Sequence, residues 1–182
     1  SSGGDGGSGG GIYVTALLSI ANSTISENNT GDGGYGGDGY YYSGGFGGSG
    51  GGIYAAGSLN IDNSTIAENL TGNGGSAYYC GDGGDGGGIY YAADLFTIQN
   101  STISGNSTGA GGTGGYDGDG SDGYGGGIFR SSGMINATNS IVAGNTASSY
   151  TNIYGIISSG ANNITNGIPL LAPLGDNGGP TE

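Results

Sequence analysis

Hydrophobic residues recur along this chain in four similar segments, and apolar and polar positions alternate within each of them. The segments open with Gly-Gly-Gly-Ile at residues 9, 50, 86 and 125. In the first segment Leu18 and Ile20 alternate with Ser19 and Ala21, a period of two that is typical of a half-buried β-strand. Apolar residues occupy equivalent places in every segment: Ile12, Ile53, Ile89 and Ile128, then Leu18, Leu59, Phe96 and Ile135, then Ile20, Ile61, Ile98 and Ala137, then Ile25, Ile66, Ile103 and Val142.

The repeat predicts an all-β solenoid. Three short strands per segment cannot bury an apolar side alone, but equivalent strands of successive segments close a core when they stack at roughly 4.8 Å. We therefore expect one parallel β-helix domain over residues 1–182, with 153–182 as a final partial coil and C-terminal segment. About four to five coils are expected in all. An antiparallel sandwich is the alternative, but it does not require the same residue at the same place in each repeat.

Two asparagine columns run through the same repeats. One follows the second strand and the other follows the third: Asn22, Asn63, Asn100 and Asn139, then Asn28, Asn69, Asn106 and Asn145. Asparagine tolerates the left-handed backbone of a turn, and its amide can bond the equivalent amide of the next coil. We expect both columns to form asparagine ladders.

Asn-x-Ser/Thr sequons offer a second interpretation of these asparagines. Six of the eight column residues lie in sequons, whereas Asn139 and Asn145 do not, although both columns continue there. This difference favours the ladder as the reason for the columns. Asn136 and Asn163 are sequon residues off the columns, and they are the better candidates for glycosylation.

Glycine supplies 50 of the 182 residues, most of them in three inserts between coils at residues 31–50, 72–87 and 109–126. Other residues recur at every third position there, as in Asp32, Tyr35 and Asp38. A period of three is what a glycine strand of the polyproline-II type shows, and its sideways N–H and C=O groups need neighbouring strands as partners. We expect an ordered, polyglycine-II-like stack of inserts at one corner of the solenoid. Flexible glycine linkers are the alternative.

The charge balance excludes several kinds of partner. Fourteen acidic residues and a single basic one, Arg130, give a net charge of −13, which argues against nucleic acids and anionic membranes. The chain has no apolar run long enough to span a membrane, so we expect no membrane insertion. Cys80 is the only cysteine, so it is either a buried thiol or an intermolecular link.

Calcium is the only cofactor for which the sequence has candidate ligands. Residues 33–41, with Asp38, fit one calcium-binding nonapeptide, and Asp117, Asp119 and Asp122 supply further carboxylates at short spacing. The nonapeptide occurs once rather than in tandem, and the second segment lacks the glutamate that closes an EF-hand loop. We expect no cofactor and leave calcium open, with solubility as the other role of these aspartates.

The residue types also argue against catalysis. The chain has no His and no Lys, and polysaccharide-cleaving β-helices need a base or clustered carboxylates. The coil carboxylates are few, and Glu27 and Glu68 hold equivalent places that we expect to face solvent. A shared fold is no sign of a shared activity, so we expect a non-enzymatic protein.

The repeat unit, as in "GGGIYAAGSLNIDNSTIAENL", resembles the repeats of bacterial cell-surface β-helix proteins, including those with a choice-of-anchor Q domain. It is more distantly similar to polymorphic outer-membrane protein repeats. Residues 168–182, "IPLLAPLGDNGGPTE", resemble the closing segment of the choice-of-anchor Q family. The glycine inserts resemble the polyglycine-II bundles of some antifreeze and phage-adhesin proteins. The resemblance implies a secreted or surface-displayed, right-handed β-helix and supplies no catalytic residues.

These observations predict a structural protein of the cell surface. The open strand edges of a parallel β-helix can pair end to end, which would build a fibre or filament from self-associating subunits. The alternative is a monomeric adhesin or carbohydrate-binding module that contacts surface glycans. The tyrosines, such as Tyr41 and Tyr79, would be the sequence feature of this module, because a tyrosine ring can stack on a sugar. The same rings can instead pack the inserts onto the coils.

Overall fold

The computed structural model describes residues 1–182 except 38, 117, 168 and 172–182, and the described part contains twelve β-strands and no helix. The strands are β1 (Ile12–Val14), β2 (Leu18–Ala21), β3 (Thr24–Ser26), β4 (Ile53–Ala55), β5 (Leu59–Asp62), β6 (Thr65–Ala67), β7 (Ile89–Gln99), β8 (Thr102–Ser104), β9 (Ile128–Thr138), β10 (Ile141–Val142), β11 (Ile153–Tyr154) and β12 (Ile157–Ala161).

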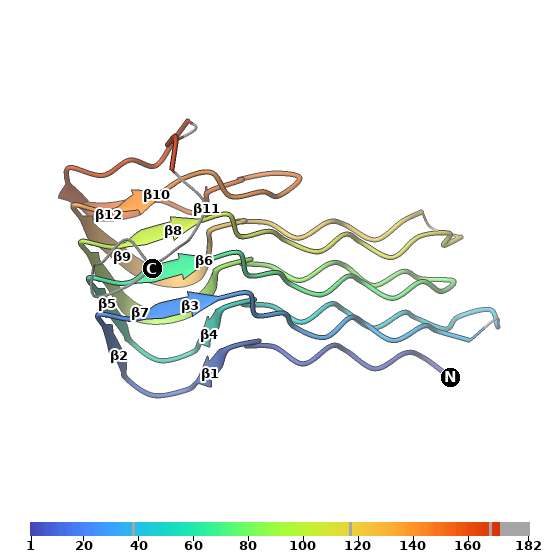
Figure 1. Ribbon diagram of the computed structural model, residues 1–182. Coiled ribbons are helices and arrows are strands. Elements are labelled where there is room, and N and C mark those ends of the chain that lie inside the picture. Colours follow the sequence, from blue (N-terminus) through green and yellow to red (C-terminus); the bar gives the residue numbers. More distant parts are fainter. Residues whose placement is uncertain (38, 117, 168, 172–182) are drawn as a thin grey trace.

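Equivalent strands pair in parallel and in register, which confirms the parallel β-solenoid (Figure 1). Ile12 lies opposite Ile53, Ile53 opposite Ile89, and the column continues through Ile128 to Ile153. The coils that begin with β4, β7 and β9 thus lie between two neighbours, and those that begin with β1 and β11 lie at the edges. Only these three coils are enclosed on both sides, which is fewer than the four to five coils predicted in all. The right-handed winding remains a prediction from the resemblance.

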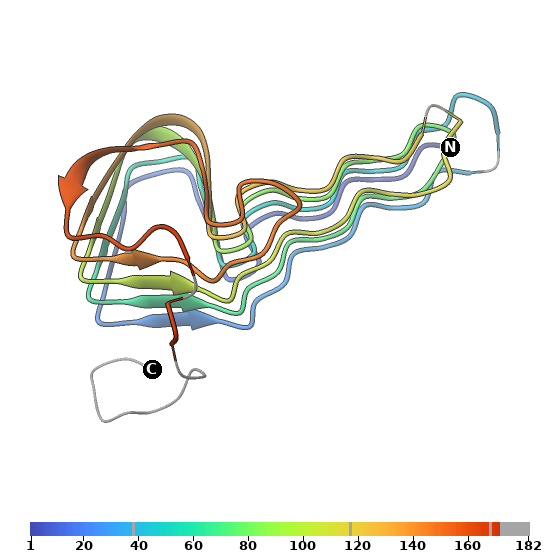
Figure 2. The ribbon, with the colours of Figure 1, turned by 90° about the horizontal axis from the view of Figure 1, so that it is seen from above.

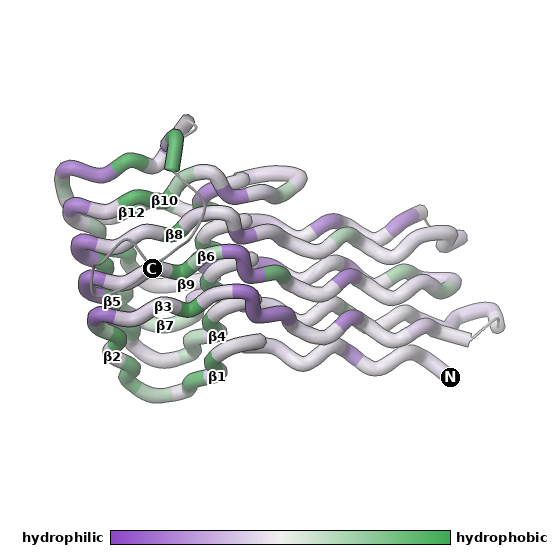
Figure 3. Tube along the Cα trace, in the orientation of Figure 1, coloured by the Kyte–Doolittle hydropathy of each residue, from purple (hydrophilic) through white to green (hydrophobic). Residues whose placement is uncertain are grey.

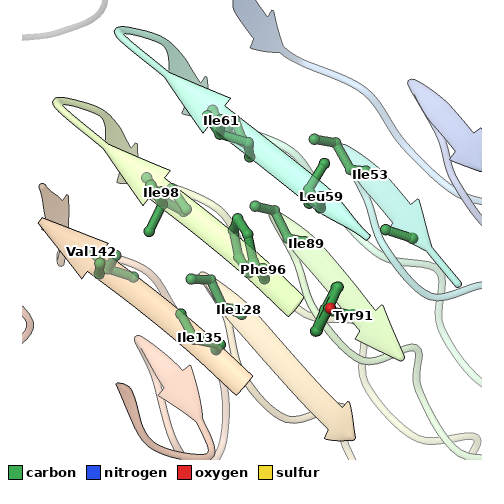
Figure 4. Packing of buried hydrophobic residues seen from close by; sticks show 14 of the residues in the cluster. Ile53, Leu59, Ile61, Ile89, Tyr91, Phe96, Ile98, Ile128, Ile135 and Val142 are labelled. Atoms are coloured by element: carbon green, nitrogen blue, oxygen red, sulfur yellow. The ribbon is translucent and has the colours of Figure 1, made fainter. Parts of the chain in front are cut away.

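The apolar side of each strand faces the inside of the solenoid (Figure 4). Ile53, Leu59, Ile61 and Ile66 of the second coil are all at most 1% exposed. Their counterparts in the third and fourth coils are equally buried, except that Ala137 replaces an isoleucine. Ile12, Leu18 and Ile25 of the first coil are only partly buried, because no described coil covers them on the outer side.

Two corners of each coil require a left-handed backbone. The first corner is an asparagine in every coil, with φ values of 49°, 49°, 48°, 51° and 59° at Asn22, Asn63, Asn100, Asn139 and Asn162. The second corner is Glu27 or Glu68 in the first two coils, both at 57°, and glycine in the next two, Gly105 and Gly144. Asparagine and glycine adopt this conformation at low cost, so backbone geometry accounts for these corner residues but not for the two glutamates.

The three glycine inserts and the N-terminal tract, residues 1–10, form a flat stack that projects from one side of the coils (Figures 1 and 2). We call this stack the glycine flap. Every third N–H of the N-terminal tract donates to the returning strand of the first insert, from Gly3 to Ser43, Gly6 to Phe46 and Gly9 to Ser49, at 2.8–2.9 Å. The outgoing and returning strands of each insert also form main-chain hydrogen bonds with each other at every third residue. The flap is therefore ordered, with the polyglycine-II-like hydrogen bonding that the period of three predicts.

Candidate functional site

The buried polar column of the solenoid is the second asparagine column. Asn69, Asn106 and Asn145 are at most 7% exposed, and each Nδ2 donates to the Oδ1 of the next asparagine at 2.8–3.2 Å. The ladder begins at Asn28, whose Nδ2 lies 2.9 Å from Asn69 Oδ1. The described ladder closes on a residue that the sequence reasoning missed, Asn152. This inner ladder satisfies amides that would be costly to bury alone.

The first asparagine column lies on the outside instead. Asn22, Asn63, Asn100 and Asn139 are all exposed. Asn63 donates to Asn22 and Asn139 donates to Asn100, but the Asn100 amide donates to Asp62 at 3.1 Å. The prediction of a continuous amide ladder is therefore wrong at this step. The left-handed corner, rather than burial, is what places asparagine here.

The two glycosylation candidates differ in their surroundings. Both polar atoms of the Asn163 side chain bond the main chain, since Oδ1 accepts from Ser140 N–H and Nδ2 donates to Ala137 O at 2.7 Å. A glycan on Asn163 Nδ2 would compete with that bond. Asn136 accepts a hydrogen bond from the Ser159 hydroxyl, and its Nδ2 is not used in that contact. Asn136 is therefore the better acceptor of the two.

Two hydroxyl columns hold the coils and the flap together, and sequence reasoning missed both. Ser64, Ser101 and Ser140 each accept the N–H of the serine one coil earlier, at 3.1–3.2 Å. At the root of the flap, the Thr30 and Thr71 hydroxyls donate across to Gly48 and Gly84 and accept from Gly72 and Gly109. The recurrence of Asn-Ser-Thr in the repeats was the signal that could have found the serine column.

The polar residues at every third position of the flap have a structural use. Each hydrogen-bond acceptor takes the N–H of the equivalent residue in the next layer, which would otherwise face solvent. Asp5 accepts from Phe46, Asp32 from Asn73 and Asp82 from Ser121, at 2.7–2.8 Å. Figure 3 shows these hydrophilic positions recurring along an otherwise neutral flap. The sequence spacing predicted these residues at every third position, but it did not predict their hydrogen bonds to the main chain.

This arrangement also accounts for two of the four calcium candidates. Asp119 accepts from Gly114 N–H and Asp122 from Gly111 N–H, at 2.8 and 2.9 Å. Asp38 and Asp117 lie outside the described residues. In the described part of the chain no three acidic, Cys or His side chains gather as they would around a metal ion.

Among the described aspartates of the flap, Asp85 is the one whose pKa is shifted from its ordinary value. Burial raises its pKa above the ordinary 3.8, the bond from Tyr124 N–H lowers it, and the nearby negative charge of Asp82 raises it. Its carboxylate oxygen lies 2.8 Å from Tyr124 N. Asp85 is thus a carboxylate whose charged form is disfavoured in the folded flap.

A column of aromatic rings runs along the outer face of the first strand position. Tyr13, Tyr54, Tyr90, Phe129 and Tyr154 stack face to face, with neighbouring centroids 4.5–5.1 Å apart and planes within 13° of parallel. These rings form what we call the aromatic ladder. They pack on each other, and at one end of the ladder Tyr124 of the third insert contacts Tyr154, with ring centroids 5.9 Å apart. Each inner ring has both faces covered by its neighbours.

A second group of tyrosines lies at the far end of the flap, with members from all three inserts. Tyr40, Tyr78 and Tyr116 come from the first, second and third inserts, and Tyr35 lies beside them. We call these four residues the tip cluster. The Tyr78 ring stacks on Tyr116 at 4.9 Å and 10°, and Tyr40 meets it edge-on at 5.7 Å. The cluster lines a cavity of about 470 Å³ together with Ser76 and Thr113.

Comparisons with protein-family models, with curated proteins and with solved structures find no match for this chain. The likeness to the choice-of-anchor Q family therefore remains a prediction. Within the described residues, no helix is long and apolar enough to cross a membrane. Cys80 is a free thiol of intermediate exposure, and its sulfur lies 3.5 Å from Ala77 O.

Proposed function

We propose that this chain is a non-enzymatic structural protein, secreted or displayed at a cell surface, that stacks head to tail into a fibre. The observation that carries the proposal is the open edge of the first coil. The strands β1 and β2 end the larger sheet and β3 ends the smaller one. Unpaired strand edges invite pairing with another chain unless charge, proline or a cap protects them.

The side chains of this edge suit a second copy. Ile12, Val14, Leu18 and Ile25 are left partly exposed, although their counterparts in the second and third coils are fully buried. Tyr13, the first ring of the aromatic ladder, is 59% exposed and presents a ring face at the edge. A coil added beneath would continue the apolar, serine and asparagine columns. Such a contact joins unlike surfaces and does not close, so it produces a filament.

The residue types support the non-enzymatic part of the proposal. The polar columns of the coils bond one another or the main chain, as the inner ladder and the serine column do. Glu27 and Glu68 face solvent at left-handed corners. The polar residues of the inner ladder and the serine column thus stabilise the stacking of successive coils.

Blocking the edge with proline tests the fibre. Leu18 N–H donates into the second coil, to Ser58 O at 3.0 Å, so by the alternation of a strand the Ser19 N–H faces the open edge. Ser19→Pro removes that donor and adds a ring there. We expect wild-type protein to form fibres or growing oligomers with concentration, and Ser19→Pro to shift it toward monomers in sedimentation velocity and electron microscopy.

The matched control is Ser19→Ala, which keeps the N–H and should assemble like the wild type. Circular dichroism checks that both variants retain the β-sheet. Wild-type protein that sediments as a monomer at millimolar concentration would refute the fibre and favour a monomeric surface module.

A further inference from the structure

Large exposed aromatic side chains gather at the tip of the flap. Tyr40 and Tyr116 are 79% and 78% exposed, and Tyr35 is 64% exposed. Elsewhere along the flap the third positions are mostly small or acidic acceptors that bond the next layer. The tip rings are far from the apolar core, so core packing does not require several tyrosines at this place. Exposed aromatic groups of this kind mark interaction sites.

Main-chain hydrogen bonds between inserts hold Tyr78 and Tyr116 of the tip cluster, and Tyr40 lies in the turn of the first insert. Tyr116 N–H donates to Tyr78 O at 2.9 Å, and Tyr79 N–H donates to Tyr42 O at 3.1 Å. Three inserts of successive coils therefore bring their rings to one place in a defined order. The polyglycine-like hydrogen bonds behind them fix that order, so the cavity is largely formed before a ligand arrives.

The lining of the cavity restricts the ligand. Its described residues are tyrosine, serine, threonine, alanine and glycine, and none of them carries a charge. The only basic side chain of the protein, Arg130, belongs to strand β9 of the coils, so no basic side chain is available there for phosphate or sulfate. Hydroxyl groups on every side disfavour a purely apolar ligand. A neutral molecule with one apolar face and many hydroxyl groups fits these conditions.

We propose that the tip cluster binds a neutral saccharide, with pyranose C–H faces against the rings of Tyr40 and Tyr116 and sugar hydroxyls bonded to Ser76, Thr113 and the phenol groups. A volume of about 470 Å³ lies within the usual range for small-molecule sites and suits a short oligosaccharide. Tyrosine combines an apolar ring with a polar end, which is what such a surface requires.

The aromatic ladder makes a useful contrast. Its inner rings lie 4.5–5.1 Å apart and nearly parallel, so their faces are covered and a sugar meets only ring edges. At the tip, Tyr40 stands at 61° to Tyr78, and both Tyr40 and Tyr116 remain mostly exposed. The saccharide site therefore belongs to the tip and not to the ladder.

This inference does not depend on fibre formation, because all the lining residues come from the inserts of one chain. In a fibre, each subunit would add one tip cluster on the same side, which would raise avidity for a polysaccharide. The two proposals can therefore fail separately.

The test is titration of the full chain with cellohexaose, chitohexaose, xylohexaose and mannohexaose, and with oligogalacturonate as an anionic probe. Binding is followed by calorimetry and by saturation-transfer NMR. We expect at least one neutral oligosaccharide to bind, with tyrosine ring protons of the tip in contact with sugar protons. Tyr116→Ala and Tyr40→Ala should each weaken that binding about tenfold or more, since each removes an aromatic face on which the sugar ring packs.

Tyr116→Phe separates the ring from its hydroxyl, and it should weaken binding less than Tyr116→Ala. Tyr150→Ala is the matched control, because Tyr150 is also exposed but does not line the tip cavity. Sedimentation of each variant shows whether assembly is unchanged. The inference is overturned if none of the neutral oligosaccharides binds at millimolar concentration, if oligogalacturonate binds more tightly than all of them, or if Tyr150→Ala weakens binding as much as the tip variants.

Discussion

Asparagine has two different functions in this molecule, and burial separates them. In the inner ladder, Asn106 is fully buried, and its amide bonds the main chain and the next asparagine at once. At the outer corner, Asn63 is exposed with a φ of 49°, and the left-handed backbone is the reason for the residue. One amino acid repeated at two places therefore reflects two physical requirements.

One buried polar group in the coils is not paired by a hydrogen bond as these asparagines are. The Tyr91 hydroxyl is buried and has no hydrogen-bond partner among the described residues. Burial raises the pKa of Tyr91 to about 12, and the negative charge of Asp94 adds to this effect. An unpaired buried hydroxyl costs roughly 1–3 kcal/mol.

Tyr91→Phe removes the unpaired hydroxyl and keeps the ring. We expect the free energy of unfolding to rise by about 1 kcal/mol at neutral pH. The folded pKa lies above the ordinary value of 10.0, so the wild type loses stability as pH rises from about 10 toward 12, and the variant's advantage should grow there. Urea unfolding at pH 7 and pH 11 measures both effects. Tyr13→Phe, on the outer face and 59% exposed, should change little, and an unchanged or lower stability of Tyr91→Phe would contradict the prediction.

At the scale of elements, the flap is a sheet-like body built without strands. Its layers meet through glycine main chains at a distance that excludes side chains. A Cβ atom at Gly84 would collide with the carbonyl oxygen of Gly48, whereas a Cβ at Gly7 would meet nothing within 4 Å. Glycine is therefore a packing requirement at some flap positions and not at others.

Gly84→Ala and Gly7→Ala form a matched pair that tests this packing. Gly84→Ala should lower the free energy of unfolding by about 1–3 kcal/mol, as overpacking does elsewhere, and Gly7→Ala should have much less effect. Hydrogen exchange gives a local measurement, since the amides of residues 72–87 should be protected in the wild type and lose protection in Gly84→Ala. Rapid exchange of these amides in the wild-type protein would mean that the flap is a set of flexible linkers.

The flap also makes a pH-dependent contribution through Asp85. Its raised folded pKa means that the folded protein binds the proton more tightly than the unfolded chain does. The stability that comes from the protonated form is present at low pH and is lost as pH rises from about 3.8 through the folded pKa. Asp85→Asn keeps an acceptor for Tyr124 N–H and removes the charge.

Asp85→Asn should therefore be more stable than the wild type at pH 7, and the difference should vanish near pH 3. Thermal unfolding across this range measures it. Asp32→Asn is the control, because Asp32 accepts Asn73 N–H in the same way but is exposed. An equal gain from both variants would assign the effect to net charge rather than to the burial of Asp85.

For the whole molecule, the parts that repeat were the parts that sequence could predict. The isoleucine columns gave the stacking order, and the spacing of Asp32 and Tyr35 gave the period of the flap. The partners of Thr30 and Thr71 were not predictable, because a threonine fits a strand equally well without bridging two flap strands. The tip cluster was not predicted either, although Tyr40, Tyr78 and Tyr116 follow one another at 38 residues, because only the stacking of three inserts shows that their rings meet.

The net charge of the molecule determines how readily its copies associate side by side. A net charge of −13 with one basic residue makes copies repel each other, and several of the acidic groups lie on the flap. The isoelectric point of the chain is about 4.1, so its net charge approaches zero as pH falls from 7 to 4, and repulsion between copies falls. The flat polar faces of the flaps can then approach side by side. We expect lateral association as pH falls from 7 to 4, seen as a rise in light scattering that reverses at pH 7.

Salt separates this effect from unfolding. At pH 7, about 1 M NaCl shortens the screening length to roughly 3 Å and should promote the same association while circular dichroism stays unchanged. Ser19→Pro, which blocks only the coil edge, should associate laterally like the wild type, because the faces involved are those of the flap. Scattering that rises only together with loss of β-sheet signal would assign the low-pH effect to unfolding and contradict the electrostatic account.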